Sequence, residues 1–292
     1  MNWKKIFVTI AAFLLCWINA SLHAAEPARL PFYEAQNGNV RLYILGTFHI
    51  GQANVPLRQE ITQALSRSSQ LIMELSAEEL SRIESLLPSI FCRDACLRRQ
   101  TSSTVFTKII SSLPGKTVIL ERIPAWLISA MLVVNDASKL GLSPEWGTEE
   151  KLIKAWGNRP TLGLETAEEQ LGNMTSLDDS IQREMLEGYL MLPEEKRMAL
   201  IQKLYQIWQD GDTEALLGFY QEMNEGQNLS SDTVQKSDEK LIYSRNKRFI
   251  ERLQPFLTPD EPVFMAVGAL HLGGDQGILA LLRARGFKIT AR

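Results

Sequence analysis

The stretch "LYILGTFHIG", Leu42–Gly51, is apolar until it reaches a glycine, then turns polar and presents a histidine. Near the other end of the chain, "VFMAVGALHLGG", Val263–Gly274, does the same. Both are strand-like runs that stop at Gly-x-x-His, with Gly46 and His49 in the first and Gly268 and His271 in the second. Glycine lets the backbone turn sharply there without a Cβ clash. We therefore expect both histidines to face the same edge of one sheet.

The segments around the first motif predict a parallel sheet. A helical pattern follows it, and "QLIMELS" then reads as a second short strand with Glu74 near its end. Strand, helix, strand is the usual marker of parallel pairing. "RPTLGLET" reads as a later strand that closes with Glu165, and Thr166 and Glu169 have the spacing of a capping box for the next helix.

The predicted fold class is α/β, with a central, mostly parallel sheet that carries the paired motifs and a large helical insert. We expect one domain over residues 25–292, with the insert at about residues 80–160 and 170–258. Within it, "IPAWLISAMLVV" is apolar nearly all round, which predicts a helix that is buried or lines a groove.

The first residues have the pattern of a secretory signal. Lys4 and Lys5 precede an apolar run, Ile6–Ile18, which is short for a membrane span, and small residues follow. We expect cleavage after Ala24, export across the inner membrane to the periplasm, and no transmembrane anchor in the mature chain. An uncleaved N-terminal anchor is the alternative.

The charge balance argues against nucleic acid as a partner. The chain has 31 basic and 34 acidic residues, and loss of Lys4 and Lys5 takes the net charge from −3 to −5. No basic stripe or aromatic-interleaved basic patch accompanies this acidic balance. The sequence gives no information on the oligomeric state.

Two cysteines, Cys92 and Cys96 in "FCRDACLRRQ", remain after cleavage. In an exported protein a small-loop disulfide is the leading interpretation. Such a loop would pin a local turn, because it removes little chain entropy. A metal site is the lesser alternative, since no histidine lies nearby.

The mature chain keeps only two histidines, His49 and His271, because His23 leaves with the signal. One histidine in such a loop is more often structural, but two in the same uncommon context indicate a shared site. Glu74 and Glu165 also end predicted strands, where a buried carboxylate needs a cation or donors. For Glu165, capping of the next helix is the open alternative. Two imidazoles and a carboxylate suit a divalent metal such as Zn²⁺, Mn²⁺ or Fe²⁺.

The ordered motifs resemble the TraB/PrgY/GumN family, whose wider group includes the Tiki proteins. The resemblance covers about residues 36–290 and rests on "LGTFHIG", "LIMELS", "LGLETAEEQL", "WQDGDTEAL", "SRNKRF" and "VGALHLGGDQGILALLRARGF". It implies an α/β core with a metal-dependent, peptidase-like site.

The resemblance also assigns roles to residues. His49, His271 and Glu74 would hold the metal (Mn, Zn, Fe or Co), with Gly46 and Gly268 as motif glycines. Glu165 would orient or deprotonate the attacking water, Arg245 would polarise the carbonyl, and Asn246 would face the substrate. A capped surface helix is the alternative for Arg245 and Asn246. Relatives tend to have Asp where this chain has Glu149, which would alter the site if that acid belongs to it.

The sequence therefore predicts an exported, metal-dependent hydrolase acting on peptide or small amide bonds. The alternative is a non-catalytic periplasmic protein that binds and sequesters a peptide in the same cleft without cleaving it; the expected partner of the hydrolase is a peptide or small-molecule substrate. An exchangeable metal-bound water would separate the two.

Overall fold

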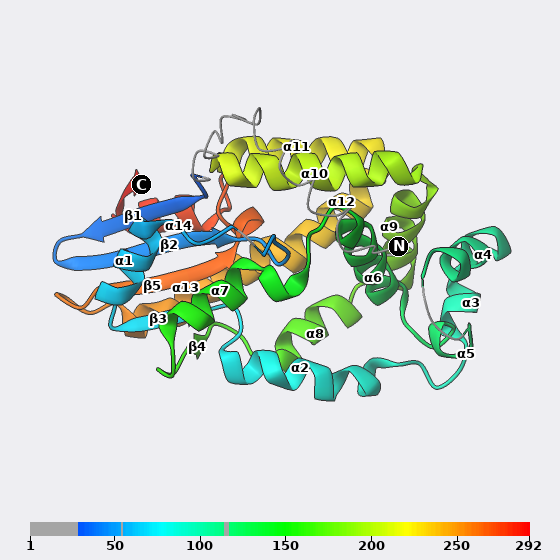
Figure 1. The fold of residues 1–292 in the computed structure, drawn as a ribbon, viewed down its shortest axis with the longest axis horizontal. Coiled ribbons are helices and arrows are strands. Elements are labelled where there is room, and N and C mark those ends of the chain that lie inside the picture. The colour runs from blue at the N-terminus through cyan, green and yellow to red at the C-terminus, as the bar shows by residue number, and fades with distance from the viewer. Residues whose placement is uncertain (1–28, 54, 114–116) are drawn as a thin grey trace, which may run out of the picture.

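The computed structural model describes residues 29–53, 55–113 and 117–292, so the predicted signal peptide lies outside the described residues. Its core is one six-stranded sheet with strand order β4-β3-β5-β2-β1-β6 (Figure 1). The strands are β1 Phe32–Asn37, β2 Val40–Thr47, β3 Gln70–Met73, β4 Leu162–Gly163, β5 Val263–Gly268 and β6 Lys288–Ala291.

The sheet is parallel where the motifs lie and antiparallel at one side. β5 pairs parallel with β2 and β3, and β3 pairs parallel with β4. β1 pairs antiparallel with both β2 and β6. The mostly parallel sheet of an α/β fold is thus confirmed. Because the four parallel strands point the same way, their carboxyl ends share one edge, where ligands bind in such sheets.

Alternate residues of each parallel strand pack on opposite faces of the sheet. On one face, Phe264 and Ala266 of β5 join a core with residues of α1 (Gln59–Arg67), α7 (Thr148–Trp156), α10 (Glu194–Asp210) and α11 (Thr213–Gly226). On the other, Val263, Met265 and Val267 pack against α13 (Ser244–Leu253) and α14 (Ile278–Ala284). Burial on both faces explains why β5 reads as an unbroken apolar run.

Helices fill most of the chain between β3 and β5, and two more lie outside this stretch: α1 between β2 and β3, and α14 between β5 and β6. Their bounds are α1 Gln59–Arg67, α2 Ala77–Ile90, α3 Cys96–Gln100, α4 Ser103–Ser112, α5 Thr117–Leu120, α6 Ala125–Lys139, α7 Thr148–Trp156, α8 Ala167–Thr175, α9 Asp179–Met191, α10 Glu194–Asp210, α11 Thr213–Gly226, α12 Ser231–Asp238, α13 Ser244–Leu253 and α14 Ile278–Ala284. Within the described ranges, none of them is long and apolar enough to span a bilayer.

A separate core holds the helical insert together. It is built by apolar residues of α3, α4, α5, α6 and α9.

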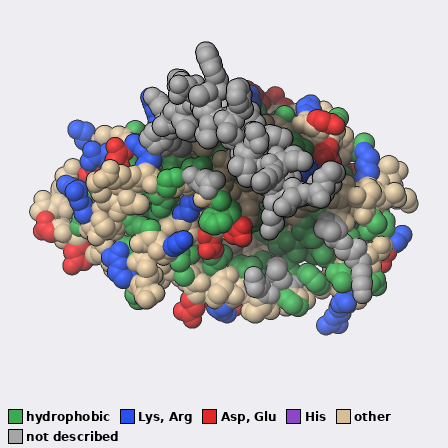
Figure 2. All heavy atoms as spheres, viewed as in Figure 1, with side chains coloured by type: hydrophobic (Ala, Val, Ile, Leu, Met, Phe, Trp, Pro, Cys, Tyr) green, Lys and Arg blue, Asp and Glu red, His purple; other side chains and the backbone are tan. Residues whose placement is uncertain are grey.

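Hydrophobic side chains are also visible in the middle of one face of the molecule, between charged side chains at its two ends (Figure 2). Val134 on α6 is one of the exposed large hydrophobic residues. The predicted disulfide is present between Cys92 and Cys96, just before and at the start of α3.

A buried charge pair ties three helices of the insert. Asp136 on α6 accepts from Arg197 Nε on α10 at 2.7 Å and from the Tyr189 hydroxyl on α9 at 2.9 Å. Burial raises the pKa of Asp136, but these donors outweigh it and hold that pKa below its ordinary 3.8. The ionised form therefore stabilises the fold at neutral pH.

We expect Asp136→Asn to lower the free energy of unfolding by about 1–2 kcal/mol at pH 7, because the Arg197 cation loses its buried counter-charge. A carboxyl with a depressed pKa contributes stability above its unfolded pKa and loses it as the pH falls through the folded one. The difference in the free energy of unfolding between wild type and Asp136→Asn should thus narrow below about pH 4. Urea unfolding of both proteins at several pH values measures this difference, with a substitution of the exposed Asp178, Asp178→Asn, as the control. A difference that stays constant with pH would contradict the ionised role of Asp136.

Candidate functional site

Every predicted site residue on the sheet lies just past the carboxyl end of a parallel strand. Glu165 follows β4, Glu74 follows β3, His271 follows β5, and His49 follows β2. Since the strand order is β4-β3-β5-β2, these four residues occur in that same order along one edge. The distances below show which of them the structure brings together.

Arg245 joins three of these residues from α13. Its guanidinium contacts the carboxylates of Glu74, at 2.5 Å, and of Glu165, and its Nη1 lies 3.2 Å from Nε2 of His271. Arg245 and its neighbour Asn246 have exposed fractions of 6% and 0%. They are therefore not residues of a solvated surface helix, which was the alternative.

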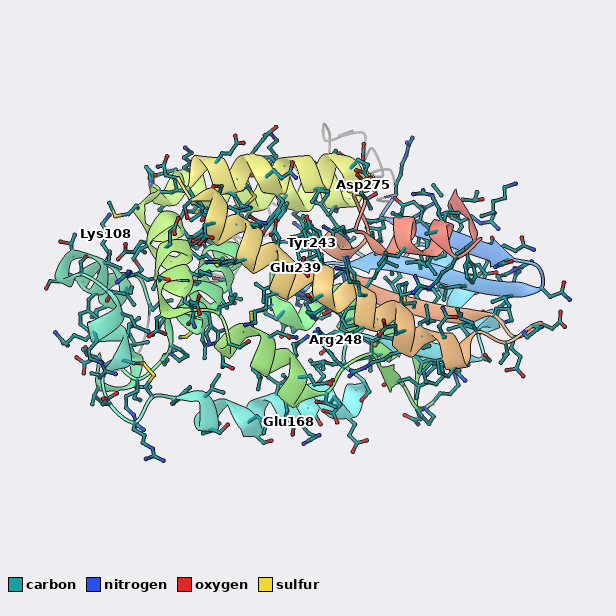
Figure 3. All side chains as sticks on the ribbon, turned by 180° about the vertical axis from the view of Figure 1, so that it is seen from behind. Lys108, Glu168, Glu239, Tyr243, Arg248 and Asp275 are labelled. Carbon is teal, nitrogen blue, oxygen red and sulfur yellow. A yellow bond between two sulfur atoms is a disulfide. The ribbon has the colours of Figure 1, made fainter. Side chains whose placement is uncertain are left out.

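The helix that carries Arg245 reaches the sheet from the insert. A π-helix, η3 Glu239–Tyr243, connects α12 to α13, and the three run on as one long helix. Seen from behind, this helix crosses from the insert to the sheet, with Glu239, Tyr243 and Arg248 labelled along it (Figure 3). π-Helical turns are often found at functional sites. Here the turn lies directly before the two site residues.

His271 is held in one tautomer. The amide nitrogen of Asn246 donates to the carbonyl of Gln276 at 2.9 Å, so its oxygen faces Nδ1 of His271, at 2.7 Å. Nδ1 therefore carries the proton, and Nε2 is left with its lone pair. Burial, with the nearby Arg245 cation, lowers the pKa of His271 to about 4 even though Glu74 opposes the shift. The ring is neutral at pH 7, as a metal ligand must be.

Glu74 is the carboxylate nearest to His271. Its Oε1 accepts from the backbone N–H of Gly268 at 2.6 Å and lies 3.6 Å from Nε2 of His271. Burial raises the pKa of Glu74, but His271, Arg245 and His49 together outweigh it and lower that pKa to about 2. Glu74 is thus ionised throughout the physiological range.

Glu165 is enclosed by donors. Its side chain is 1% exposed, and Arg245 donates to both of its oxygens. Gln170 donates to Oε1 at 3.1 Å and Asn173 to Oε2 at 3.4 Å. Burial raises the pKa of Glu165, although Arg245 opposes this. The capping role proposed as its alternative belongs to Thr166, which forms the predicted capping box with Glu169.

His49 is the exposed member of the site. Its side chain is 75% exposed, and its Nδ1 lies 2.8 Å from Oε1 of Glu149. The same oxygen accepts from the Thr47 hydroxyl at 2.6 Å. The negative charge of Glu149 raises the pKa of His49 to about 9. Glu149 therefore belongs to the site, as the partner of His49.

Four polar residues of the site were not predicted as such: Thr47, Glu149, Gln170 and Asn173. Thr47 lies inside the first motif, and Glu149 was noted only as a departure from relatives. Gln170 and Asn173 follow Glu165 by five and eight residues on α8, so helical spacing could have indicated that they turn back toward it.

The donor set is compatible with a divalent metal. Within residues 29–53, 55–113 and 117–292, no three His, Cys, Asp or Glu side chains already form a metal-binding group. However, ligands about 2.1 Å from a metal lie about 3.0–3.5 Å from one another, and Glu74 Oε1 and His271 Nε2 are 3.6 Å apart. Both histidines are held through Nδ1, so Nε2 is the nitrogen that would bind a metal, the usual arrangement around a metal-binding imidazole. Because the pKa of His49 is about 9, its Nε2 also carries a proton at pH 7, which metal binding would displace.

Gly268 provides the space between these donors. A Cβ atom there would lie 3.2 Å from Glu74 Oε1, 3.5 Å from His271 Cδ2 and 4.0 Å from His49 Nε2. The missing side chain thus leaves a small volume bordered by all three predicted ligands. A metal on His271 Nε2 would replace the contact with Arg245 Nη1, while Arg245 keeps both carboxylates.

Comparison with known proteins places the chain in a family. The uncharacterized protein YbaP of Escherichia coli K12 is 23% identical over 254 residues, covering 84% of this chain and 89% of the relative. The thioredoxin/glutathione peroxidase BtuE of the same organism is 26% identical over 174 residues, 56% of this chain and 93% of the relative. No solved structure matches. The model of the TraB/PrgY/gumN family matches residues 31–291. The chain belongs to the TraB/PrgY/gumN family.

Proposed function

We propose that this protein is an exported, metal-dependent hydrolase that cleaves peptide or small amide bonds. The observation that carries the proposal is the convergence of Glu74, His271 and His49 around Gly268. The Oε1 atom of Glu74 and the Nε2 atom of His271 are 3.6 Å apart, close to the separation of two ligands on one metal. His49, His271 and Glu74 would hold Mn, Zn, Fe or Co. When bound, such a metal supplies an acidified water and polarises a carbonyl.

The protein's own groups would perform the remaining tasks. Arg245, held by the carboxylates of Glu74 and Glu165, places positive charge at the site, where it can stabilise negative charge that develops on the substrate carbonyl oxygen. Glu165 fits orientation of Arg245 better than proton transfer, because both of its oxygens accept hydrogen bonds and it is buried. Asn246 keeps His271 in its Nδ1–H tautomer, a support for the site rather than a direct substrate contact.

Export is part of the proposal. The signal-like start of the sequence and the Cys92–Cys96 disulfide both fit an oxidising compartment such as the periplasm. Expression of the full chain should yield a periplasmic product whose mass, measured on the intact protein, corresponds to a chain that starts at Ala25.

The test of the activity is incubation of the purified mature protein with a mixed peptide library and Mn²⁺, Zn²⁺, Fe²⁺ or Co²⁺, followed by mass spectrometry. We expect new peptide termini that appear with metal and disappear with chelator or in His271→Ala. Peptides that are retained but remain intact would favour the capture protein instead. Neither cleavage nor retention would contradict both functions.

A further inference from the structure

The loop that presents His49 is fixed by a second segment, Ser143–Glu149, which precedes α7 and includes its first two residues. Gly51 and Ser143 exchange two backbone hydrogen bonds, of 3.0 and 2.9 Å. Thr148 donates its backbone N–H to the carbonyl of Phe48 at 3.0 Å, and its hydroxyl accepts from the N–H of Phe48 at 3.2 Å. The backbone on both sides of His49 is therefore tied to this segment.

Two glycines allow the segments to approach so closely. A Cβ on Gly147 would lie 2.5 Å from the carbonyl oxygen of His49. A Cβ on Gly51 would overlap the carbonyl of Trp146. Neither contact could be relieved by a side-chain rotation, because both involve backbone atoms. The approach of the segments is thus built into the sequence on both sides.

Glu149 is the side chain that this approach delivers to His49. Its Oε1 accepts from Thr47 at 2.6 Å and lies 2.8 Å from Nδ1 of His49. Glu149 is itself largely buried, whereas the ring it holds is exposed. An exposed ring has few other contacts to fix it, so this one carboxylate sets which nitrogen faces the site.

We infer that Glu149 is a positioning residue for His49, which presents Nε2 of the ring for metal binding. The inference rests on the proposed function for the use of Nε2, and on the geometry alone for the hold on Nδ1. Reach matters as much as charge: aspartate at this position is shorter by one C–C bond, about 1.5 Å, and could not keep both the Thr47 and the His49 contacts from the same backbone.

The experiment compares four variants of the mature protein: Glu149→Ala, Glu149→Asp, Glu149→Gln and the control Glu150→Ala, whose side chain is exposed in the same turn. Calorimetric titration with Mn²⁺ or Zn²⁺ measures affinity. Loss of a carboxylate that orients a ligand histidine lowers metal affinity about 10–100-fold, and we expect this loss for Glu149→Ala and Glu149→Asp. Glu149→Gln keeps the side-chain length and an accepting oxygen, so its metal affinity should fall less. The affinity of Glu150→Ala should match that of wild type.

Proton NMR of the metal-free protein tests the hold on Nδ1 separately. A hydrogen-bonded His49 Nδ1–H should give a downfield resonance in wild type, Glu149→Gln and Glu150→Ala that is absent in His49→Ala, Glu149→Ala and Glu149→Asp. If wild type binds no metal, the proposed function fails, and this resonance alone decides the positioning role. Unchanged metal affinity in Glu149→Ala, or a resonance that survives that substitution, would overturn the inference while leaving the proposed function standing.

Discussion

Arg245→Met should lower the free energy of unfolding by about 3–5 kcal/mol at pH 7, the range for removing one partner of a buried ion pair. The reason is that Glu74 and Glu165 would face each other, buried, with no cation between them. Methionine retains most of the volume of the arginine stem, so the loss reports charge rather than a cavity. Urea unfolding measures it.

The pH dependence of this variant follows from the same contacts. Without Arg245, burial and the neighbouring carboxylate raise a folded-state carboxyl pKa above its unfolded value of about 4.3. A group with a raised pKa is most favourable below the unfolded pKa and becomes costly as the pH rises through the folded one. The loss of unfolding free energy in Arg245→Met, relative to wild type, should therefore shrink toward pH 4. Lys247→Met, on the exposed side of the same helix, is the control. If Arg245→Met were as stable as wild type, the claim that the Arg245 cation stabilises the buried carboxylates of Glu74 and Glu165 would be contradicted.

The two motif histidines should differ strongly in what they contribute to folding. His271→Ala should cost about 2–3 kcal/mol, because it leaves the buried oxygen of Asn246 without its donor and opens space beside Phe249. His49→Ala should cost no more than about 1 kcal/mol, because that ring is mostly exposed and its ion pair is only partly shielded from water.

Chemical denaturation of both variants without added metal measures this difference. Equal losses would contradict the account, since they would require His49 to be as well packed as His271. A large loss in His271→Ala alone would show that the second motif has a structural role in addition to its proposed chemistry.

The local sequence pattern was sufficient to predict the parallel part of the sheet. β2 and β5 are long apolar runs that end at glycine, and the Thr166 capping box marked the start of α8 correctly. β1 was missed, although Asn37-Gly38 before β2 is a hairpin signal and Gly38 has a positive φ of 57°. The polar residues Glu34, Gln36 and Asn37 in this strand obscured its apolar pattern.

The candidate site was predictable where residues end strands and not where helices return to them. His49, Glu74, Glu165 and His271 could be placed on one edge, because parallel strands share their carboxyl ends. The hydrogen bonds of Gln170 to Glu165 and of Glu149 to His49 depend on how α8 and α7 pack. Helical spacing hints at the Gln170 contact, but no local pattern encodes the packing of α7 that brings Glu149 to His49, so that contact had to come from the structure.

The most direct test of the account is the metal content of the protein purified after expression of the full chain, measured by elemental mass spectrometry beside His49→Ala and His271→Ala. After loading with Mn²⁺, Zn²⁺, Fe²⁺ or Co²⁺, the account predicts close to one metal per wild-type chain and almost none in either variant. His49→Ala is the more informative of the two, because its fold should be nearly unchanged. Metal retained in full by His49→Ala, or no metal in wild type under any loading, would contradict a shared site built from the two Gly-x-x-His motifs.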